Sequence, residues 1–315
     1  MTSFANLQCA ATAGRMFARE SLGPINHAVG SQGVNMAPTS VPLSNAEARE
    51  LVRVIYDHSG IVLAGDKKSL ISSRLNKRLR ILDLRSFRDY LRYLWDAPDG
   101  DAEIVAMIDA ITTNKTEFFR EHQHFDFLVS AILPKLVRSD WTTLNIWCAG
   151  CSTGEEPYSL AMVLAEYFGS TRNFTIVATD LCTQALQTAR KAVYSNALGK
   201  SIPFGLRQKY TLTGHGSQAG RFRIVPELRD RITFGYHNLI ASDWDIAPAL
   251  DAVFCRNVMI YFDFKTRSRI IAKFRARLKP DGHLFIGHAE SLSGIDRVLG
   301  FVQVRPTIYA LQRAP

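Results

Sequence analysis

The chain has 315 residues, a length that favours about two domains. The hydrophobic fraction of 47% is ample for buried cores, but no apolar run approaches the roughly 18 residues of a membrane-spanning helix, which argues against membrane insertion. The formal net charge of +9 favours an acidic partner, such as an acidic protein surface, nucleic acid or an anionic membrane.

Residues 1–43 are rich in Ala, Ser, Gly and Asn and show little hydrophobic periodicity. Such a composition predicts a flexible tail. The stretch also lacks the compact apolar core of a signal peptide.

Helical periodicity begins at Ser44. Ser44 followed by Glu47 is typical of a capping box, and apolar residues at helical spacing come after it. No strand-like alternation interrupts this part of the chain. Residues 44–112 are therefore predicted to form a small helical domain. The further helices are expected over residues 67–82, 86–95 and 101–111.

Basic side chains concentrate in the second and third of these helices. Between residues 67 and 92, nine basic residues are opposed by only two acidic ones, a net charge of +7. A solvated helix face is one interpretation, and a docking surface for an acidic macromolecule is the other. DNA is disfavoured, because no helix-turn-helix or aromatic-interleaved pattern is present. The residues expected to dock a partner are Arg74, Lys77, Arg78 and Arg80.

Residues 112–120 (TTNKTEFFR) connect the helical domain to the rest of the chain. A polar cluster followed by two Phe predicts a loop that leads into a helix packed on the core. Asn114 and Arg120 can reach a cofactor carboxylate from this loop, since a guanidinium matches a carboxylate well. Capping or surface roles are the alternative for both.

The chain is organised around residues 144–182. An apolar run at the start is typical of a buried parallel strand, and a turn bracketed by Gly150 and Gly154 follows it. Pro157 suits the first turn of the next helix. A second apolar run ends at Asp180, at the strand tip where a ribose hydroxyl is usually bound. This strand–turn–helix–strand unit predicts a nucleoside site.

Two carboxylates at the start of that helix restrict the kinds of ligand that can bind there. A pyrophosphate needs the bare positive end of a helix, but here Glu155 and Glu156 occupy it. They repel a dinucleotide and attract an amine or a sugar edge. S-adenosylmethionine, with a cationic amino-acid tail, a nucleoside and no phosphate, fits best. The alternative is an ordinary helix start with favourable acidic residues.

The five cysteines lack a spaced disulfide pattern. Cys148 and Cys151 form a C-x-x-C pair, but no second pair or nearby histidine completes a zinc site. We therefore expect buried thiols, no metal, and a reducing cytoplasmic compartment.

Residues 195–230 are predicted to form an inserted β-rich subdomain. A glycine-rich hairpin signal that contains Gly214, Gly216 and Gly220 precedes two strand-like runs, residues 222–225 and 232–239. Such insertions often recruit partners, and an elaborated loop is the alternative.

The remaining sequence alternates strands and helices. A strand from residue 251, a helix over 265–278, a turn at 279–282 and a strand over 283–287 predict a parallel, doubly wound α/β sheet. A short connection between the last two strands predicts a hairpin with an antiparallel edge strand.

The carboxyl ends of parallel strands meet at one edge of such a sheet, where ligands bind. The turn after the first strand and the tips of the later strands should therefore meet in a single site. The residues at these positions are Gly150, Gly154, Glu155, Glu156, Asp180, Asn238, Leu239, Arg256 and Asn257.

Four stretches carry a family resemblance. They are residues 114–120 (NKTEFFR), 152–158 (STGEEPY), 254–262 (FCRNVMIYF) and 278–290 (LKPDGHLFIGHAE). In this order they resemble the chemotaxis-receptor glutamate methyltransferases, over about residues 44 to 311.

The resemblance implies a class I methyltransferase-like domain over residues 113–315, with the inserted β-subdomain within it and the helical domain before it. It also implies transfer of a methyl group from S-adenosylmethionine to glutamates on the cytoplasmic helices of chemoreceptors. The glycine hairpin resembles the version that holds a receptor's carboxy-terminal tether peptide.

Carried over to this chain, the family's roles fall into groups. Arg120 and Tyr261 are expected near the reacting groups. The cofactor contacts implied are Asn114, Thr116 and Arg120, with Glu155 and Glu156, near the methionine part; Asp180 at the ribose; Asn238 and Leu239 beside the adenine; and Arg256 and Asn257 at the pocket floor.

The chemistry asks for little acid–base work. A glutamate with a pKa of about 4.3 is already ionised at neutral pH, and a sulfonium releases its methyl group without needing a proton. What remains is in-line positioning of the carboxylate. We therefore expect Arg120 and Tyr261 to orient the acceptor rather than to act as bases.

Two other functions stay open. One is methyl transfer to another acceptor, such as nucleic acid or a small molecule. The strand ending in Cys-Arg-Asn-Val argues against amino-group methylation, which commonly uses an Asn/Asp-Pro-Pro-aromatic element. The other is a non-catalytic module that senses the cofactor, and the presence of Arg120 and Tyr261 argues against it.

Overall fold

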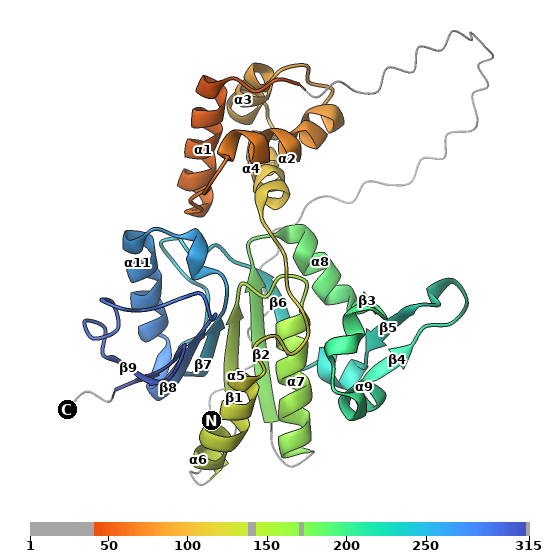
Figure 1. Cartoon of the computed structure of the whole chain (residues 1–315), viewed down its shortest axis with the longest axis vertical. Helices are drawn as coiled ribbons and strands as arrows, with labels where there is room; N and C mark the ends of the chain where they lie inside the picture. The colour runs from red at the N-terminus through yellow and green to blue at the C-terminus, as the bar shows by residue number, and fades with distance from the viewer. Residues whose placement is uncertain (1–40, 138–142, 170–172, 313–315) are drawn as a thin grey trace. The chain divides into compact units, whose positions relative to one another are not determined.

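The computed structural model describes residues 41–137, 143–169 and 173–312 (Figure 1). Most of the predicted tail, residues 1–40, lies outside these ranges. The last residues before Ser44 are packed: Leu43 is buried, and the Val41 amide donates to Asn76 Oδ1 at 2.8 Å. The described structure therefore begins slightly before the first helix.

The helical region is built from α1 (Asn45–Ser59), α2 (Lys67–Ile81), α3 (Phe87–Asp96) and α4 (Gly100–Ile111). The predicted capping box is confirmed: Ser44 Oγ accepts from the Glu47 amide at 3.2 Å, and Glu47 Oε2 accepts from the Ser44 amide at 2.8 Å. Apolar side chains at helical spacing, including Leu51, Leu75 and Tyr90, are fully buried in a core of their own.

Gly60 ends α1 in the left-handed conformation, with φ at +71°. A Cβ there would lie 2.6 Å from Ile240 Cγ2, so no larger residue fits this turn without displacement. After the turn, Leu63 is still buried in the helical core, and Ile61 packs against it.

Among the described residues, the main sheet has seven strands in the order β6-β2-β1-β7-β8-β10-β9. Strands β6, β2, β1, β7 and β8 are parallel, and β10 pairs antiparallel with both β8 and β9. This confirms the predicted doubly wound sheet with an antiparallel hairpin at its edge. The strands are β1 (Thr143–Ala149), β2 (Asn173–Asp180), β6 (Ile232–Tyr236), β7 (Leu250–Cys255), β8 (Leu278–Ile286), β9 (Phe301–Arg305) and β10 (Ile308–Leu311).

The predicted turn at residues 279–282 is wrong in one respect, because these residues belong to β8. The strand accommodates them through a register shift against β7 and through Asp281, whose φ is +66°. The expected strand over 283–287 is therefore the second half of a longer, bulged strand.

The sheet is covered on both faces, as alternation along β1 requires. Ile146 joins a core with α5 (Gln123–Phe127), α6 (Leu133–Val137) and α7 (Glu155–Phe168). Its neighbour Trp147 faces the other way and stacks edge-on against Phe274 of α11 (Phe264–Arg275), with ring centroids 5.1 Å apart. A π-helical turn, η1 (Leu128–Ile132), links α5 to α6, and α8 (Thr183–Lys191) follows β2.

The predicted β-subdomain is confirmed as a small antiparallel sheet, β3-β5-β4. Phe222 of β5 and Tyr194 of β3 pack against Phe118, with ring centroids 5.9 Å and 5.0 Å away.

None of the helices in the described ranges combines the length and apolar character that crossing a membrane demands. The remaining elements are β3 (Val193–Ser195), η2 (Leu198–Ser201), α9 (Phe204–Tyr210), β4 (Thr211–Thr213), η3 (Gly216–Gln218), β5 (Arg221–Ile224), α10 (Pro226–Arg229) and η4 (Met259–Tyr261).

Candidate functional site

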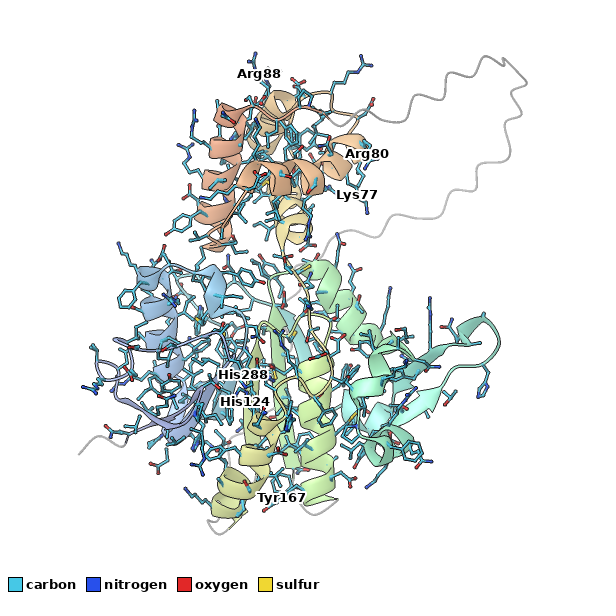
Figure 2. All side chains as sticks on the ribbon, in the orientation of Figure 1. Lys77, Arg80, Arg88, His124, Tyr167 and His288 are labelled. Atoms are coloured by element: carbon cyan, nitrogen blue, oxygen red, sulfur yellow. The ribbon has the colours of Figure 1, made fainter. Side chains whose placement is uncertain are left out.

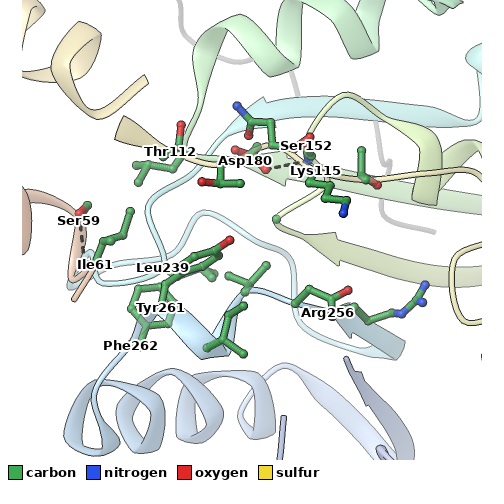
Figure 3. A pocket seen from close by; sticks show the side chains of 18 of the residues that line it. Ser59, Ile61, Thr112, Lys115, Ser152, Asp180, Leu239, Arg256, Tyr261 and Phe262 are labelled. Atoms are coloured by element: carbon green, nitrogen blue, oxygen red, sulfur yellow. Dashed lines mark hydrogen bonds between the residues drawn. The ribbon is translucent and has the colours of Figure 1, made fainter. Parts of the chain in front are cut away.

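A cavity of about 560 Å³ opens over the carboxyl ends of the parallel strands (Figure 3). This is the position at which doubly wound sheets bind ligands, and the volume suits a nucleoside-sized molecule. The predicted site residues that line it are Asn114, Thr116, Arg120, Gly150, Glu156, Asp180, Asn238, Leu239, Arg256, Asn257 and Tyr261.

The turn between β1 and α7 forms one wall of the cavity. Gly150 has φ at +90°, and a Cβ there would lie 2.4 Å from Val258 Cγ2, so the turn requires glycine. The amides of Gly150 and Cys151 both donate to the Thr179 carbonyl, at 2.8 Å and 2.9 Å. These bonds fix the turn against the end of β2.

Asp180 is held rigidly at the tip of β2. Its Oδ2 accepts from the Ser152 amide at 2.7 Å, and its Oδ1 accepts from the Cys182 amide at 2.8 Å. Burial raises the pKa of Asp180, and these backbone donors oppose the rise. Because each carboxylate oxygen can accept more than one hydrogen bond, Asp180 can still accept from ligand hydroxyls in the cavity.

The two glutamates at the start of α7 have different surroundings. Glu156 lines the cavity and pairs with Arg256, Oε2 to Nη1, at 3.0 Å. Glu155 is buried outside the lining, as is Gly154, and it accepts from Thr153 Oγ1 at 2.6 Å. Consecutive helical residues point about 100° apart, and here only the Glu156 side chain faces the cavity.

A buried ion-pair network forms the floor of the cavity. Arg256, at the end of β7, pairs with Glu156 and also with Glu121, whose Oε2 lies 3.1 Å from Nη2. The same guanidinium donates to the Arg120 carbonyl. Burial raises the pKa of Glu121, but Arg256 and the His288 amide more than offset this and leave it below the usual value. Arg256 thus braces the backbone at Arg120.

Glu121 and Glu290 are site residues that sequence reasoning missed. Glu290 is buried and its carboxylate accepts from the amides of Asn257 and Ile260, at 3.0 Å and 3.2 Å, which fixes the turn after β7. Glu121 follows the 114–120 stretch directly, and Glu290 ends the 278–290 stretch. Their positions beside or within these two stretches could have marked both glutamates as candidate site residues.

Arg120 and Tyr261 both reach the cavity. Arg120 Nη1 donates to the Lys115 carbonyl at 3.1 Å, which folds its side chain along the 114–120 loop. Figure 3 shows Tyr261 on the same side of the cavity as Leu239 and Phe262, with Asp180 and Ser152 across from them. The cavity therefore has a polar side and a largely apolar side.

The helical region also contributes to the lining, which the sequence did not predict. Residues 61–64 line the cavity, and the Val62 amide donates to the Tyr261 carbonyl at 2.8 Å. Asn238 Nδ2 donates to the His58 carbonyl at 2.7 Å. Asn238 thus holds the end of α1 beside the cavity.

The predicted docking residues on α2 divide into two kinds. Lys77 and Arg80 are exposed, as is Arg88 of α3 (Figure 2). Arg74 is exposed but donates to the carbonyls of Ala110 and Thr112, at 3.2 Å and 3.3 Å.

Arg78 is turned inward and pairs with Glu103, Nε to Oε1 at 2.9 Å. Glu103 is buried and also accepts from Tyr90 Oη at 2.7 Å. Arg78 therefore satisfies a buried carboxylate within the helical region, and this contact accounts for part of the basic excess on α2.

Gly214, Gly216 and Gly220 lie in the β4–β5 hairpin and none of them lines the cavity. Gly216 and Gly220 have φ at +56° and +80°, and the Gly214 amide donates to the Arg221 carbonyl at 2.9 Å. The glycines thus shape the tip of the hairpin.

The four cysteines in the described ranges are buried and free, and Cys9 lies outside those ranges. Burial raises the pKa of Cys148 and of Cys151 well above the usual value, which suits unreactive thiols. Cys182 Sγ accepts from Asn114 Nδ2 at 3.2 Å and so positions a side chain of the cavity lining.

Comparison with known proteins agrees with this arrangement. Residues 114–308 match the family model "CheR methyltransferase, SAM binding domain", and residues 46–112 match "CheR methyltransferase, all-alpha domain". SAM is S-adenosylmethionine.

Three curated relatives are similar over most of their length. The chain is 40% identical over 274 residues to the "Chemotaxis protein methyltransferase" of Klebsiella aerogenes, covering 87% of this chain and 92% of the relative. It is 39% identical over 272 residues to the protein of the same name from Escherichia coli, covering 86% and 92%. It is 44% identical over 238 residues to "Chemotaxis protein methyltransferase 2" of Pseudomonas aeruginosa, covering 75% and 83%.

Proposed function

The chain belongs to the CheR methyltransferase family, and from this we propose that it methylates glutamate side chains on the cytoplasmic helices of chemoreceptors. It is an S-adenosylmethionine-dependent methyltransferase of the chemotaxis type. The product on the receptor is a glutamyl methyl ester, and the product left in the site is S-adenosylhomocysteine.

The observation that carries the proposal is the lining of the cavity. At the tip of β2, the carboxylate oxygens of Asp180 can accept hydrogen bonds from hydroxyl groups of a ligand. Glu156 offers a second carboxylate beside the β1–α7 turn, and Arg120 and Tyr261 line the same cavity. A phosphate-free nucleoside with a cationic tail suits the carboxylates. An acceptor carboxylate suits Arg120.

We assign the remaining contacts by motif and position. Asp180 binds the ribose hydroxyls, and Asn238 and Leu239 flank the adenine. Asn114, Thr116 and Arg120 lie toward the methionine end, with Glu156 nearest the amine. Arg256 and Asn257 close the floor, where Arg256 acts mainly by holding Glu156 and the Arg120 backbone.

Bound S-adenosylmethionine supplies a methyl group on a sulfonium that departs as a neutral thioether. The protein's residues orient and partly desolvate the acceptor, because a glutamate with a pKa of about 4.3 is already ionised at neutral pH. Arg120 and the Tyr261 hydroxyl point one carboxylate oxygen along the transfer axis. Too tight an ion pair would reduce the nucleophilicity of that oxygen, so Arg120 has to orient the carboxylate without binding it strongly.

We propose a matching division of labour along the chain. Residues 113–315 carry out methyl transfer, and residues 44–112 dock the acidic receptor helices through Lys77, Arg80 and Arg88, with Arg74 at the edge of this surface. The hairpin that contains Gly214, Gly216 and Gly220 is the part of the β-subdomain assigned to a receptor tether peptide. No role is assigned to residues 1–43.

The test uses labelled S-adenosylmethionine and purified receptor cytoplasmic fragments. We expect label to enter the receptor fragment and to be released as methanol in mild base, as a methyl ester requires. Base-stable label would indicate amine methylation and another acceptor class. Cofactor binding without any transfer would indicate a sensing module. A receptor fragment with its acceptor glutamates changed to alanine is the control.

A further inference from the structure

Three potential metal ligands meet beside the cofactor cavity without lining it. Glu121 precedes α5, His124 lies in α5, and His288 follows β8. One ligand atom from each lies within 4.8 Å of the other two. Figure 2 shows His124 and His288 together, and their ring centroids are 5.7 Å apart.

The tautomer of His124 is set by Thr307. The Thr307 hydroxyl donates to the Pro306 carbonyl at 2.6 Å, so Oγ1 accepts from His124 Nε2 at 2.9 Å. With its proton on Nε2, the imidazole carries a lone pair on Nδ1. His124 is 1% exposed, and Nδ1 has no hydrogen-bond partner among the described residues.

That lone pair faces another acceptor. Glu121 Oε2 lies 3.7 Å from His124 Nδ1, its side chain is 8% exposed, and it is paired on another side with Arg256 Nη2 at 3.1 Å. Two buried acceptors facing each other are unfavourable unless a proton, a water or a cation lies between them.

A third potential ligand reaches the same oxygen. His288 Nε2 lies 3.9 Å from the same Glu121 oxygen, and the His288 side chain is 55% exposed, so it can adjust. We propose that Glu121, His124 and His288 bind a divalent metal ion such as zinc or cobalt. Two histidines and one glutamate are a known zinc donor set that leaves the fourth position to water.

The distances suit such an ion with little movement. Zinc–ligand bonds of about 2.0–2.2 Å place neighbouring ligand atoms roughly 3.5 Å apart in a tetrahedron. The observed 3.7 Å and 3.9 Å to Glu121 are slightly longer, and the two histidine nitrogens lie within 4.8 Å of each other, so the exposed His288 has to move inward. Thr307 already holds the far nitrogen of His124, as outer partners of metal-binding histidines do.

Arg256 limits the affinity. Its Nη2 lies 3.1 Å from Glu121 Oε2, so a metal ion competes with a guanidinium for this oxygen. We therefore expect binding in the micromolar range, weaker than in a structural zinc site. Glu121 stays oriented in either case, because its Oε1 accepts from the His288 amide at 3.2 Å and from Asn257 Nδ2 at 3.3 Å.

The test is direct metal titration of the full chain, prepared without a histidine tag and stripped with EDTA. We expect zinc to bind with one equivalent per chain by calorimetry, and cobalt to give the visible absorption of a tetrahedral or five-coordinate site. His288→Ala should weaken binding by at least about tenfold. His122→Ala, an exposed histidine in the same segment and outside the cluster, is the matched control and should bind like the parent protein.

Equal zinc affinity in His288→Ala and the parent protein would overturn the proposal, and so would the absence of saturable binding. The latter result would mean that a bridging water satisfies Nδ1. Circular dichroism checks that both variants fold. Because the titration needs neither receptor nor S-adenosylmethionine, its outcome is independent of the proposed function.

Discussion

Two groups of charged residues differ sharply in their surroundings. Those at the cavity floor, Arg256 with Glu121 and Glu156, are buried and joined at 3.0–3.1 Å. Those on the helical region, Lys77, Arg80 and Arg88, are exposed. Buried charges act through fixed geometry and are costly to unpair, whereas exposed charges act over distance and are screened by salt. The first group suits a constant cofactor, and the second suits a large and variable partner.

Replacing Arg256 should have the largest effect. Arg256→Met leaves two buried carboxylates without their cation, so we expect the free energy of unfolding to fall by about 3–5 kcal/mol. Urea denaturation followed by circular dichroism measures the change. Arg80→Met is the matched control, and an exposed site should change stability by less than about 0.5 kcal/mol. Similar losses of stability in Arg256→Met and Arg80→Met would contradict the difference between the buried and the exposed charges.

Asp180→Asn should come next, with cofactor affinity as the measured quantity. Replacing the carboxylate weakens the charge-assisted hydrogen bonds to ribose hydroxyls, worth about 1.5–3 kcal/mol, or about 10- to 100-fold in the dissociation constant. Calorimetry with S-adenosylhomocysteine gives the value. Asp245→Asn, at an exposed position outside the cavity, should bind normally. Undiminished affinity in Asp180→Asn would show that the ribose lies elsewhere.

Tyr261→Phe tests orientation of the acceptor. Loss of one hydrogen bond of about 1 kcal/mol should reduce turnover several-fold while the dissociation constant for the cofactor stays unchanged. Steady-state receptor methylation and calorimetry separate the two quantities. Tyr236→Phe, an exposed tyrosine outside the cavity lining, is the control. Parent-like turnover in Tyr261→Phe would remove Tyr261 from the mechanism.

Charge reversal on the helical region should have the smallest effect and the strongest salt dependence. Lys77→Glu with Arg80→Glu is expected to raise the KM for receptor fragments a few-fold at low salt, because exposed pairs contribute about 0.2–1 kcal/mol each. The difference should shrink as salt rises. The same reversal at Lys265 and Arg275, both exposed on α11, is the control. Equal KM values for the two double variants would mean that the basic side chains of α2 are only solvated and do not dock the receptor.

The parts of the fold that sequence predicted are those fixed by local chemistry. The capping box at Ser44, the glycine turn after β1 and the place of Asp180 at the end of β2 each follow from a few neighbouring residues. The edge hairpin followed from the short connection between β9 and β10. Convergence of the strand ends then follows from the rule for parallel sheets.

What sequence did not predict depends on contacts between distant segments. Arg78 is one of the basic residues of α2 that were expected to dock a partner, but it points inward because it pairs with Glu103 of α4. Glu121 became significant only because Arg256 reaches it from β7. Residues 61–64 have no distinguishing composition, yet Gly60 directs them to the cavity. Hydrophobic periodicity carries no information about such pairings.

The short segment after Gly60 has a thermodynamic consequence. Because residues 61–64 belong to the chain that carries the basic helices and also line the cavity, a partner that shifts them changes the free energy of cofactor binding. Linkage requires the reverse effect to be equal in size. A partner docked on the helical region and a ligand in the cavity would then influence each other's affinity through a single stretch of backbone.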